Sequence, residues 1–319
     1  YGYDNIQSTM LEKSHITKGV KDNYDVFVDR IRNTLCGMGY NECITYPFGG
    51  KTLYNKLSLD GAQDLSKNIA LLNPLGEELS LMRRNLACDI LQVCATNHGR
   101  KNSDFKLYEV GKTYLADKLP LVELPLEQNV LSLAVSNSTF DDAKQNLLTL
   151  LDVFGLKVAF TRSTREYLHC GISAEIFANG VNIGYIGQVH PLVSENFGLN
   201  KVVILSEINL DELYKISNRP IKYNAIPKYP SVSRDFAFVI DEGVATQEVM
   251  NEIKSLCPQC ESVELFDIYR GEQVGASKKS IAVSVEFRDS NKTLSDKDIE
   301  EQINKCILVL QEKFGAILR

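Results

Sequence analysis

The sequence contains no apolar run close to the roughly 18 residues that a membrane-spanning helix requires. It also opens without the basic and apolar regions of a secretory signal. These two absences predict a cytoplasmic chain with no membrane partner. The initiator methionine is missing as well, and the chain begins Tyr1-Gly2-Tyr3, which indicates a piece of a longer protein.

An excess of basic charge is also lacking. The 319 residues include 35 Lys and Arg against 41 Asp and Glu, for a net charge of −6. DNA is therefore not an expected partner, and any contact with RNA must use a local basic surface.

Disulfides are not expected, because eight cysteines without a secretion signal indicate free thiols. Cys257 and Cys260 have the spacing of a metal or redox pair. They follow a predicted helix, however, where the dipole disfavours a thiolate, and no second pair lies nearby. We favour small apolar fillers over a metal site, and no metal site is predicted.

The apolar content of 44% and charged content of 24% are those of a globular protein, and the length suits about two domains. The best boundary lies at 217–230, where three prolines fall within eleven residues and favour an extended linker.

The part after this linker has the clearest pattern. Strands are predicted at 234–241, 262–270, 279–288 and 316–319, with helices at 246–256 and from Ser295 to Gly315. Asp298 stands in capping-box position to Ser295, and Gly315 suits a helix end. The order βαββαβ is that of a ferredoxin-like fold, whose helices cover one sheet face and leave the other free.

The first two-thirds predict an α+β domain on a mainly antiparallel sheet. Amphipathic helices are expected at 22–38 and 84–96, and a third between strands 130–136 and 158–162. Further strands are expected at 42–48 and 105–115, and a hairpin of 174–177 and 182–189 turns on Asn179-Gly180.

Several blocks resemble known families. Segments 229–240 (YPSVSRDFAFVI), 265–271 (LFDIYRG), 278–282 (KKSIA) and 313–319 (KFGAILR) resemble the ferredoxin-fold anticodon-binding domain, FDX-ACB. Segments 1–6 (YGYDNI), 73–83 (NPLGEELSLMR), 107–111 (LYEVG) and 184–191 (GYIGQVHP) are similar to the β-subunit family of bacterial phenylalanyl-tRNA synthetases. The resemblance spans the whole chain.

This resemblance implies an α+β chain in three parts. Residues 1–16 would be the tail of a preceding domain and a linker, 17–222 a class II synthetase-like core with an antiparallel sheet, and 226–319 the FDX-ACB domain. The resemblance also implies an α-subunit partner within an α2β2 phenylalanine-tRNA ligase. That holoenzyme uses ATP and magnesium, and no cofactor is expected to bind this part.

The core is expected to be catalytically silent. Adenylate formation builds charge on a phosphate, which class II synthetases stabilise with arginines from two motifs. The corresponding strand 105–115 contains no arginine, and none occurs in 101–161 or 166–218. The isolated chain is therefore predicted to lack aminoacylation activity. Structural roles are favoured for His169 and His190, since neither has an acid or nucleophile at fixed spacing.

Two interpretations of the first helix stay open. The resemblance implies that the helix packs at the α-subunit interface, whereas the pattern alone is equally typical of a helix docked on its own sheet. The apolar face that would make either contact includes Tyr24, Phe27, Ile31 and Leu35.

The second domain, counted over 226–319, holds 12 Lys and Arg against 16 Asp and Glu, so bulk counterion release cannot drive RNA binding. Stacking on a local surface remains available. The candidates for contact with phenylalanine tRNA are Arg234, Tyr269, Arg270, Lys278, Lys279 and Arg288. The residues alone also fit an ordinary solvated hairpin, and the resemblance favours anticodon binding.

The resulting hypothesis is a non-catalytic portion of the ligase that supports the α subunit and binds the anticodon region. A stand-alone pseudo-synthetase acting as an interaction protein is the alternative. An independent enzyme using the cleft of the core is a third reading, disfavoured by the missing arginines.

Overall fold

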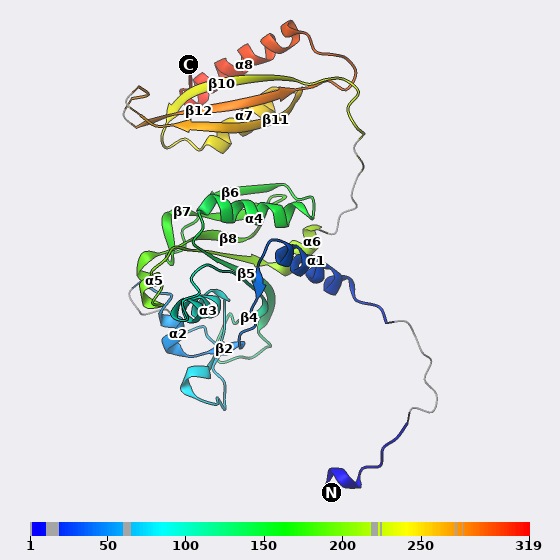
Figure 1. Cartoon of the computed structure of the whole chain (residues 1–319), viewed down its shortest axis with the longest axis vertical. Helices are drawn as coiled ribbons and strands as arrows, with labels where there is room; N and C mark the ends of the chain where they lie inside the picture. The colour runs from blue at the N-terminus through cyan, green and yellow to red at the C-terminus, as the bar shows by residue number, and fades with distance from the viewer. Residues whose placement is uncertain are drawn as a thin grey trace. The chain divides into compact units, whose positions relative to one another are not determined.

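The computed structural model describes residues 2–10, 19–59, 65–217, 223, 225–271, 273–275 and 277–319, and the chain divides into two compact units, Tyr1–Ile221 and Lys222–Arg319 (Figure 1). The start of the first unit holds one short 3-10 helix, η1 (Tyr3–Asn5). Part of the predicted linker, 218–222 and 224, lies outside the described residues. Within the described ranges, no helix combines the length and the apolar character needed to cross a membrane.

The first unit is built on a seven-stranded sheet in the order β1-β4-β5-β9-β8-β7-β6. Only the β1–β4 pair is parallel, and the other pairs are antiparallel, which confirms the predicted sheet type. The strands in chain order are β1 (Asn41–Glu42), β4 (Lys106–Leu115), β5 (Leu126–Ser136), β6 (Val158–Arg162), β7 (Leu168–Ala178), β8 (Val181–Val189) and β9 (Val203–Asn209).

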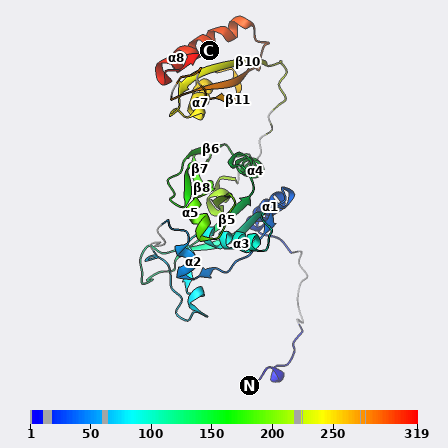
Figure 2. The same ribbon diagram turned by 60° about the vertical axis from the view of Figure 1, so that its left-hand side comes forward.

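Both faces of this sheet are buried, because successive strand residues point to opposite faces. Leu107 on β4 belongs to the apolar cluster beneath α3 (Ala87–Gly99), which also includes residues of α2 (Lys51–Asn55) and α5 (Pro191–Asn196). Its neighbour Tyr108 belongs to the opposite cluster. Helices α1 (Asn23–Gly37), α4 (Phe140–Asp152) and α6 (Leu210–Ser217) contribute to that second cluster. Figure 2 shows α1 and α4 in a second view of the same unit.

The predicted strand 42–48 is wrong as a single strand. Only Asn41 and Glu42 pair with β4, and a separate strand β2 (Phe48–Gly49) pairs with β3 (Leu81–Met82) after the 3-10 helix η2 (Glu77–Leu79). The chain leaves the sheet in between, because Thr45 binds the carboxylate of Glu109 through both its backbone N–H and its hydroxyl.

The second unit confirms the predicted βαββαβ order. Its sheet runs β11-β12-β10-β13, with β10 (Val232–Asp241), β11 (Cys260–Tyr269), β12 (Lys278–Phe287) and β13 (Ile317–Leu318). Helices α7 (Thr246–Leu256) and α8 (Asp296–Phe314) pack on one face around a single apolar core. The capping box of Ser295 and Asp298 is present, and Gly315 ends α8 at a φ of 62°.

The cysteines and histidines singled out in the sequence occupy structural positions. Cys257 is buried in the core of the second unit, directly after α7, and Cys260 packs against that core. His190 caps α5 by accepting the N–H of Leu192, and the His169 ring accepts the N–H of Gly171. Across the described residues, no group of three or more His, Cys, Asp or Glu side chains is placed to hold a metal ion.

Candidate functional site

One sheet face of the second unit is turned away from the two helices. Phe238 and Ile240 of β10 pack into the core, so the alternate residues of β10 point to the open face. The strand register extends this face across the sheet. Its centre carries small side chains and its margins carry charged ones, most of them acidic. Its members are Ser233, Asp235, Ala237, Val239, Asp241, Ser262, Glu264, Asp267, Tyr269, Lys278, Ser280, Ala282, Ser284 and Glu286.

Aromatic side chains border this open face on the edge strand β11. Tyr269 is 41% exposed, and the guanidinium of Arg319 lies 6.0 Å from the centre of its ring. A break in the register between Leu265 and Asp267 leaves Phe266 unpaired and 60% exposed. A flat floor of small side chains beside exposed rings suits stacking with a planar group.

The strand register places the predicted tRNA-binding residues on both faces of the sheet. Tyr269 and Lys278 lie on the open face, whereas Arg234 and Lys279 pair with residues of the helix-covered face. Lys279 is 7% exposed, and its Nζ donates to the backbone carbonyl of Glu242 at 3.0 Å. The expectation that Lys279 offers a free surface cation is therefore wrong.

Other predicted cations are engaged by neighbouring carboxylates or by a backbone carbonyl. Arg270 pairs with Glu242 at 3.0 Å, and this hydrogen bond lowers the pKa of the Glu242 carboxyl. Arg288 pairs with Glu261 at 2.6 Å and with Glu286 at 3.5 Å. Arg234 donates to the carbonyl of Ser233. The basic surface of this unit is consequently much weaker than the sequence suggested.

The predicted interface residues of α1 pack against their own unit. Phe27, Ile31 and Leu35 are buried within the first unit, and Ile31 is 0% exposed. Tyr24 packs against Tyr214 of α6, with ring centres 5.2 Å apart. The apolar face of α1 thus docks on its own sheet, which was the second of the two open interpretations.

Exposed apolar side chains lie elsewhere in the first unit. Ile44 is 90% exposed and Leu72 is 97% exposed, and both lie in loops flanking the small β2–β3 sheet. Tyr46 and Leu75 are also exposed in these loops. We call Ile44, Tyr46, Leu72 and Leu75 the loop patch.

A row of polar residues crosses the α3 face of the first sheet. The register aligns it over five adjacent strands, β4, β5, β9, β8 and β7, at the residues Glu109, Ser132, Glu207, Tyr185 and Glu175. The carboxylates of Glu109, Glu207 and Glu175 therefore lie on every second strand of this face. Each of them has a different partner.

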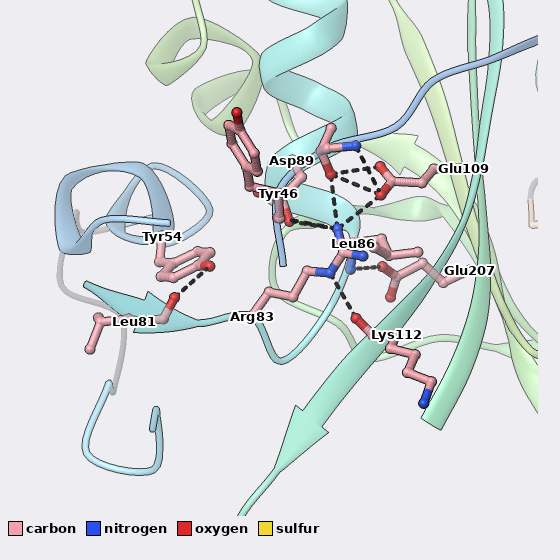
Figure 3. Close-up of polar contacts among 10 residues, drawn as sticks. Tyr46, Tyr54, Leu81, Arg83, Leu86, Asp89, Glu109, Lys112 and Glu207 are labelled. Carbon is pink, nitrogen blue, oxygen red and sulfur yellow. Dashed lines mark hydrogen bonds and ion pairs between the residues drawn. The ribbon is translucent and has the colours of Figure 1, made fainter. Parts of the chain in front are cut away.

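Arg83 neutralises the first carboxylate (Figure 3). Its Nη1 lies 2.9 Å from Glu109 and 3.7 Å from Asp89, and its Nε donates to the carbonyl of Lys112 at 2.7 Å. One buried cation thus serves two buried carboxylates. Burial raises the pKa of Asp89 to about 7, with Arg83 opposing the rise and Glu109 adding to it.

The second carboxylate, Glu207, meets the beginning of α3. It accepts the backbone N–H of Leu86 at 2.6 Å (Figure 3). The first N–H groups of a helix lack partners within the helix and carry partial positive charge, so a carboxylate is stabilised there. Burial nevertheless raises the pKa of Glu207.

The third carboxylate, Glu175, is held by Arg165 from the segment between β6 and β7. Two guanidinium nitrogens lie 2.9 and 3.2 Å from the two carboxylate oxygens. Although burial opposes it, the bonds from Arg165 and Ser163 lower the pKa of Glu175. The Arg165 guanidinium also lies 4.1 Å from the centre of the Tyr185 ring.

A cavity of about 290 Å³ lies beside this row. It is lined by Tyr54, Asn68, Arg84, Asn85, Leu115, Arg165, Tyr167 and Glu207. A second hollow of about 240 Å³ shares four of these residues, Arg84, Asn85, Arg165 and Glu207. Neither Arg84 nor Arg165 was predicted as a site residue, because both lie outside strand 105–115 and the arginine-free stretches 101–161 and 166–218.

Comparison with known proteins gives matches in both units. A family profile described as phenylalanyl tRNA synthetase beta chain CLM domain matches residues 6–210, and one described as ferredoxin-fold anticodon binding domain matches residues 227–319. The pyrrolysyl tRNA synthetase PylSc of Desulfitobacterium hafniense is similar in structure, with 13% identity, coverage of 61% of this chain and 68% of that chain, and a TM-score of 0.49.

Curated relatives extend beyond this chain. The phenylalanine–tRNA ligase beta subunits of Clostridium acetobutylicum and Clostridium tetani are 34% and 32% identical to it over its whole length. The match covers 40% and 41% of those proteins, so the chain spans about two fifths of the length of the relatives that it matches.

Proposed function

Because the chain belongs to the phenylalanyl-tRNA synthetase β-chain family, we propose that it is a non-catalytic portion of a phenylalanine-tRNA ligase. In this role it supports the α subunit and binds the anticodon region of phenylalanine tRNA. The observation that carries the proposal is the pair of family matches, one for each compact unit.

The open face of the second sheet is the proposed tRNA contact. Anticodon bases are unpaired, so they can stack on Tyr269 and Phe266 and lie over the small side chains of Ala237 and Ala282. Lys278 lies on the same face and has no ion pair within the described part of the chain, so it is the proposed phosphate contact. The acidic margins exclude a binding mode that depends mainly on charge.

The loop patch is the proposed contact with the α subunit. Large apolar side chains exposed in loops that flank one small sheet are typical of a protein interface. The main apolar face of α1 is buried against its own unit, so it offers little surface to a partner. Replacing Ile44 and Leu72 with serine is expected to weaken co-purification with the α subunit, whereas Val26→Ser, on the exposed side of α1, is the matched control.

The bonding of its carboxylates supports the proposal that the core is catalytically inactive. Glu109, Glu207 and Glu175 are each bound by a group of this chain, so they are not free to ligate a metal ion. Strand β4 contains no arginine. We therefore propose that the holoenzyme uses ATP and magnesium to activate the amino acid. The role of this core is to support the α subunit.

The test is binding of the chain to phenylalanine tRNA, with an anticodon-substituted tRNA as the control, over a series of salt concentrations. We expect tighter binding of the native anticodon and a shallow salt dependence, because stacking contributes more than phosphate contacts. Equal binding of the two tRNAs, with the α subunit present as well as absent, would contradict the proposal.

A further inference from the structure

The cavity beside the polar row contains two polar atoms that this chain leaves without a hydrogen-bond partner. Among the described residues, the buried atoms Nε of Arg84 and Oδ1 of Asn85 have none. Arg84 and Asn85 line both the 290 Å³ cavity and the adjoining hollow. The hydroxyl of Tyr185, which also lines the hollow, interacts with the carboxylate of Glu207 and opposes the rise in its pKa.

Such atoms are costly in a folded protein. Leaving a buried donor or acceptor unpaired destabilises the fold by roughly 1–3 kcal/mol. Two of them on adjacent residues of one cavity indicate that a molecule other than this chain completes the hydrogen bonds.

The charges around the cavity distinguish Arg84 from its neighbours. Arg165 is neutralised by Glu175, and Glu207 accepts the N–H of Leu86. Neither a hydrogen bond nor an ion pair joins Arg84 to any other described residue. A guanidinium group with free donors matches the two oxygens of a carboxylate or phosphate.

The other polar groups that line the cavity indicate which hydrogen-bonding groups the ligand must carry. The free Oδ1 of Asn85 can only accept a hydrogen bond, and Glu207 offers a second acceptor on the same wall. A ligand that satisfies this wall must carry a hydroxyl or amino donor. The volume of about 290 Å³ lies near the lower end for small-molecule sites, which are roughly 300–1,000 Å³, so the ligand is compact.

We propose that this cavity binds a small molecule that carries an oxyanion, either carboxylate or phosphate, together with a hydroxyl or amino group. The oxyanion binds the guanidinium of Arg84, and the donor binds Asn85 and Glu207. This site lies in the first unit and is independent of the anticodon contact proposed for the second.

The experiment is an NMR titration of the 319-residue chain that follows the Arg84 Nε–H signal, identified by its loss in Arg84→Gln. Four probes separate the two oxyanions and test the donor: acetate, glycolate, inorganic phosphate and glycerol phosphate. We expect saturable shifts, with glycolate binding several-fold tighter than acetate or glycerol phosphate several-fold tighter than inorganic phosphate. The stronger pair identifies the oxyanion.

Substitutions of the lining residues test whether the probes bind in this cavity. Arg84→Gln is expected to weaken the preferred probe by about tenfold or more, and Asn85→Ala to remove the preference for the hydroxylated probe. Arg100→Gln, which removes an exposed arginine just after α3, is the control and should bind normally.

Two outcomes would overturn the proposal. One is the absence of a saturable shift with every probe, which means that only water fills the cavity. The other is binding that survives Arg84→Gln in a variant whose unfolding midpoint matches the parent chain. Neither outcome bears on tRNA binding by the second unit.

Discussion

The backbone N–H of Leu86 donates a hydrogen bond to the carboxylate of Glu207, 121 positions later in the chain, at 2.6 Å. Leu86 is the N-cap residue of α3 and has no side chain able to cap the helix. The carboxylate of Glu207, from the middle of the sheet, caps the helix instead. The first turn of α3 is thereby fixed to β9.

Removing this carboxylate should loosen the beginning of α3. Glu207→Ala leaves the Leu86 N–H unpaired in a buried position, and we expect a loss of about 1–3 kcal/mol. Glu207→Gln keeps an oxygen acceptor and should lose clearly less. Hydrogen exchange of the α3 amides measures the difference, and equal exchange in the two variants would show that the helix does not depend on this bond.

The stability of the first unit should fall as the pH rises from about 4 to about 7. The pKa of Asp89 is about 7 in the fold and 3.8 in a free chain, so the folded state binds more protons between these values. The neutral form therefore stabilises the fold below pH 4, and this stabilisation is lost as the pH approaches 7. Urea unfolding at several pH values should show a loss of a few kcal/mol.

Asp89→Asn should flatten this pH dependence, since the amide does not titrate. Asp104→Asn, which changes an exposed aspartate in the same unit, is the control and should keep the slope of the parent chain. An unchanged slope in Asp89→Asn would assign the effect to another group.

Gly184→Ala should destabilise the first unit. A Cβ at this position would collide with the carbonyl oxygen of Glu207 on the neighbouring strand, and the φ of 154° also disfavours a side chain. We expect a loss of about 1–3 kcal/mol or more. Gly37→Ala, at the end of α1 with open space around it, should be neutral or slightly stabilising in the same urea unfolding measurement.

The two adjacent lysines of β12 should respond differently to charge reversal. Lys279→Glu places an unpaired negative charge in a buried position and should cost a few kcal/mol of stability in the second unit. Lys278→Glu should leave the unfolding midpoint nearly unchanged and weaken tRNA binding instead. The proposed tRNA contact would be refuted at this residue if the Lys278 variant bound tRNA with the same affinity and the same salt slope.

Stacking on Tyr269 can be separated from its polar contacts. Tyr269→Ala should weaken binding of phenylalanine tRNA by about 1–3 kcal/mol, whereas Tyr269→Phe should bind nearly as well. The salt slope should not change in either variant, because no phosphate contact is removed. Tyr223→Ala, which removes an exposed tyrosine outside the sheet, is the control in the same fluorescence binding assay.

The sequence predicted elements well where one face of a strand or helix is apolar. In β12, the alternation of Ile281, Val283 and Val285 with polar residues located the strand to within a residue of each end. The family matches confirm the resemblance found in the sequence blocks. By contrast, β9 was missed, because its residues are buried on both faces and the pattern has no period of two.

The candidate sites were harder to predict, since they depend on partners distant in the chain. Nothing near Arg83 in the sequence indicates that Glu109 and Asp89 share it. The burial of Lys279, however, could have been predicted from the sequence. Lys279 stands two residues before Ile281, so strand alternation places both side chains on the helix-covered face. Spacing alone could not say whether α1 docks on its own sheet or on a partner.

The position of β9 has a consequence for how the first unit is synthesised. It lies between β5 and β8, yet it is the last strand of the sheet to leave the ribosome. Until residues 203–209 emerge, the growing chain holds two half-sheets with unpaired edges, a state prone to wrong pairing. We therefore expect folding of this unit to be completed late in translation, with nascent chains that end before β9 depending on chaperones.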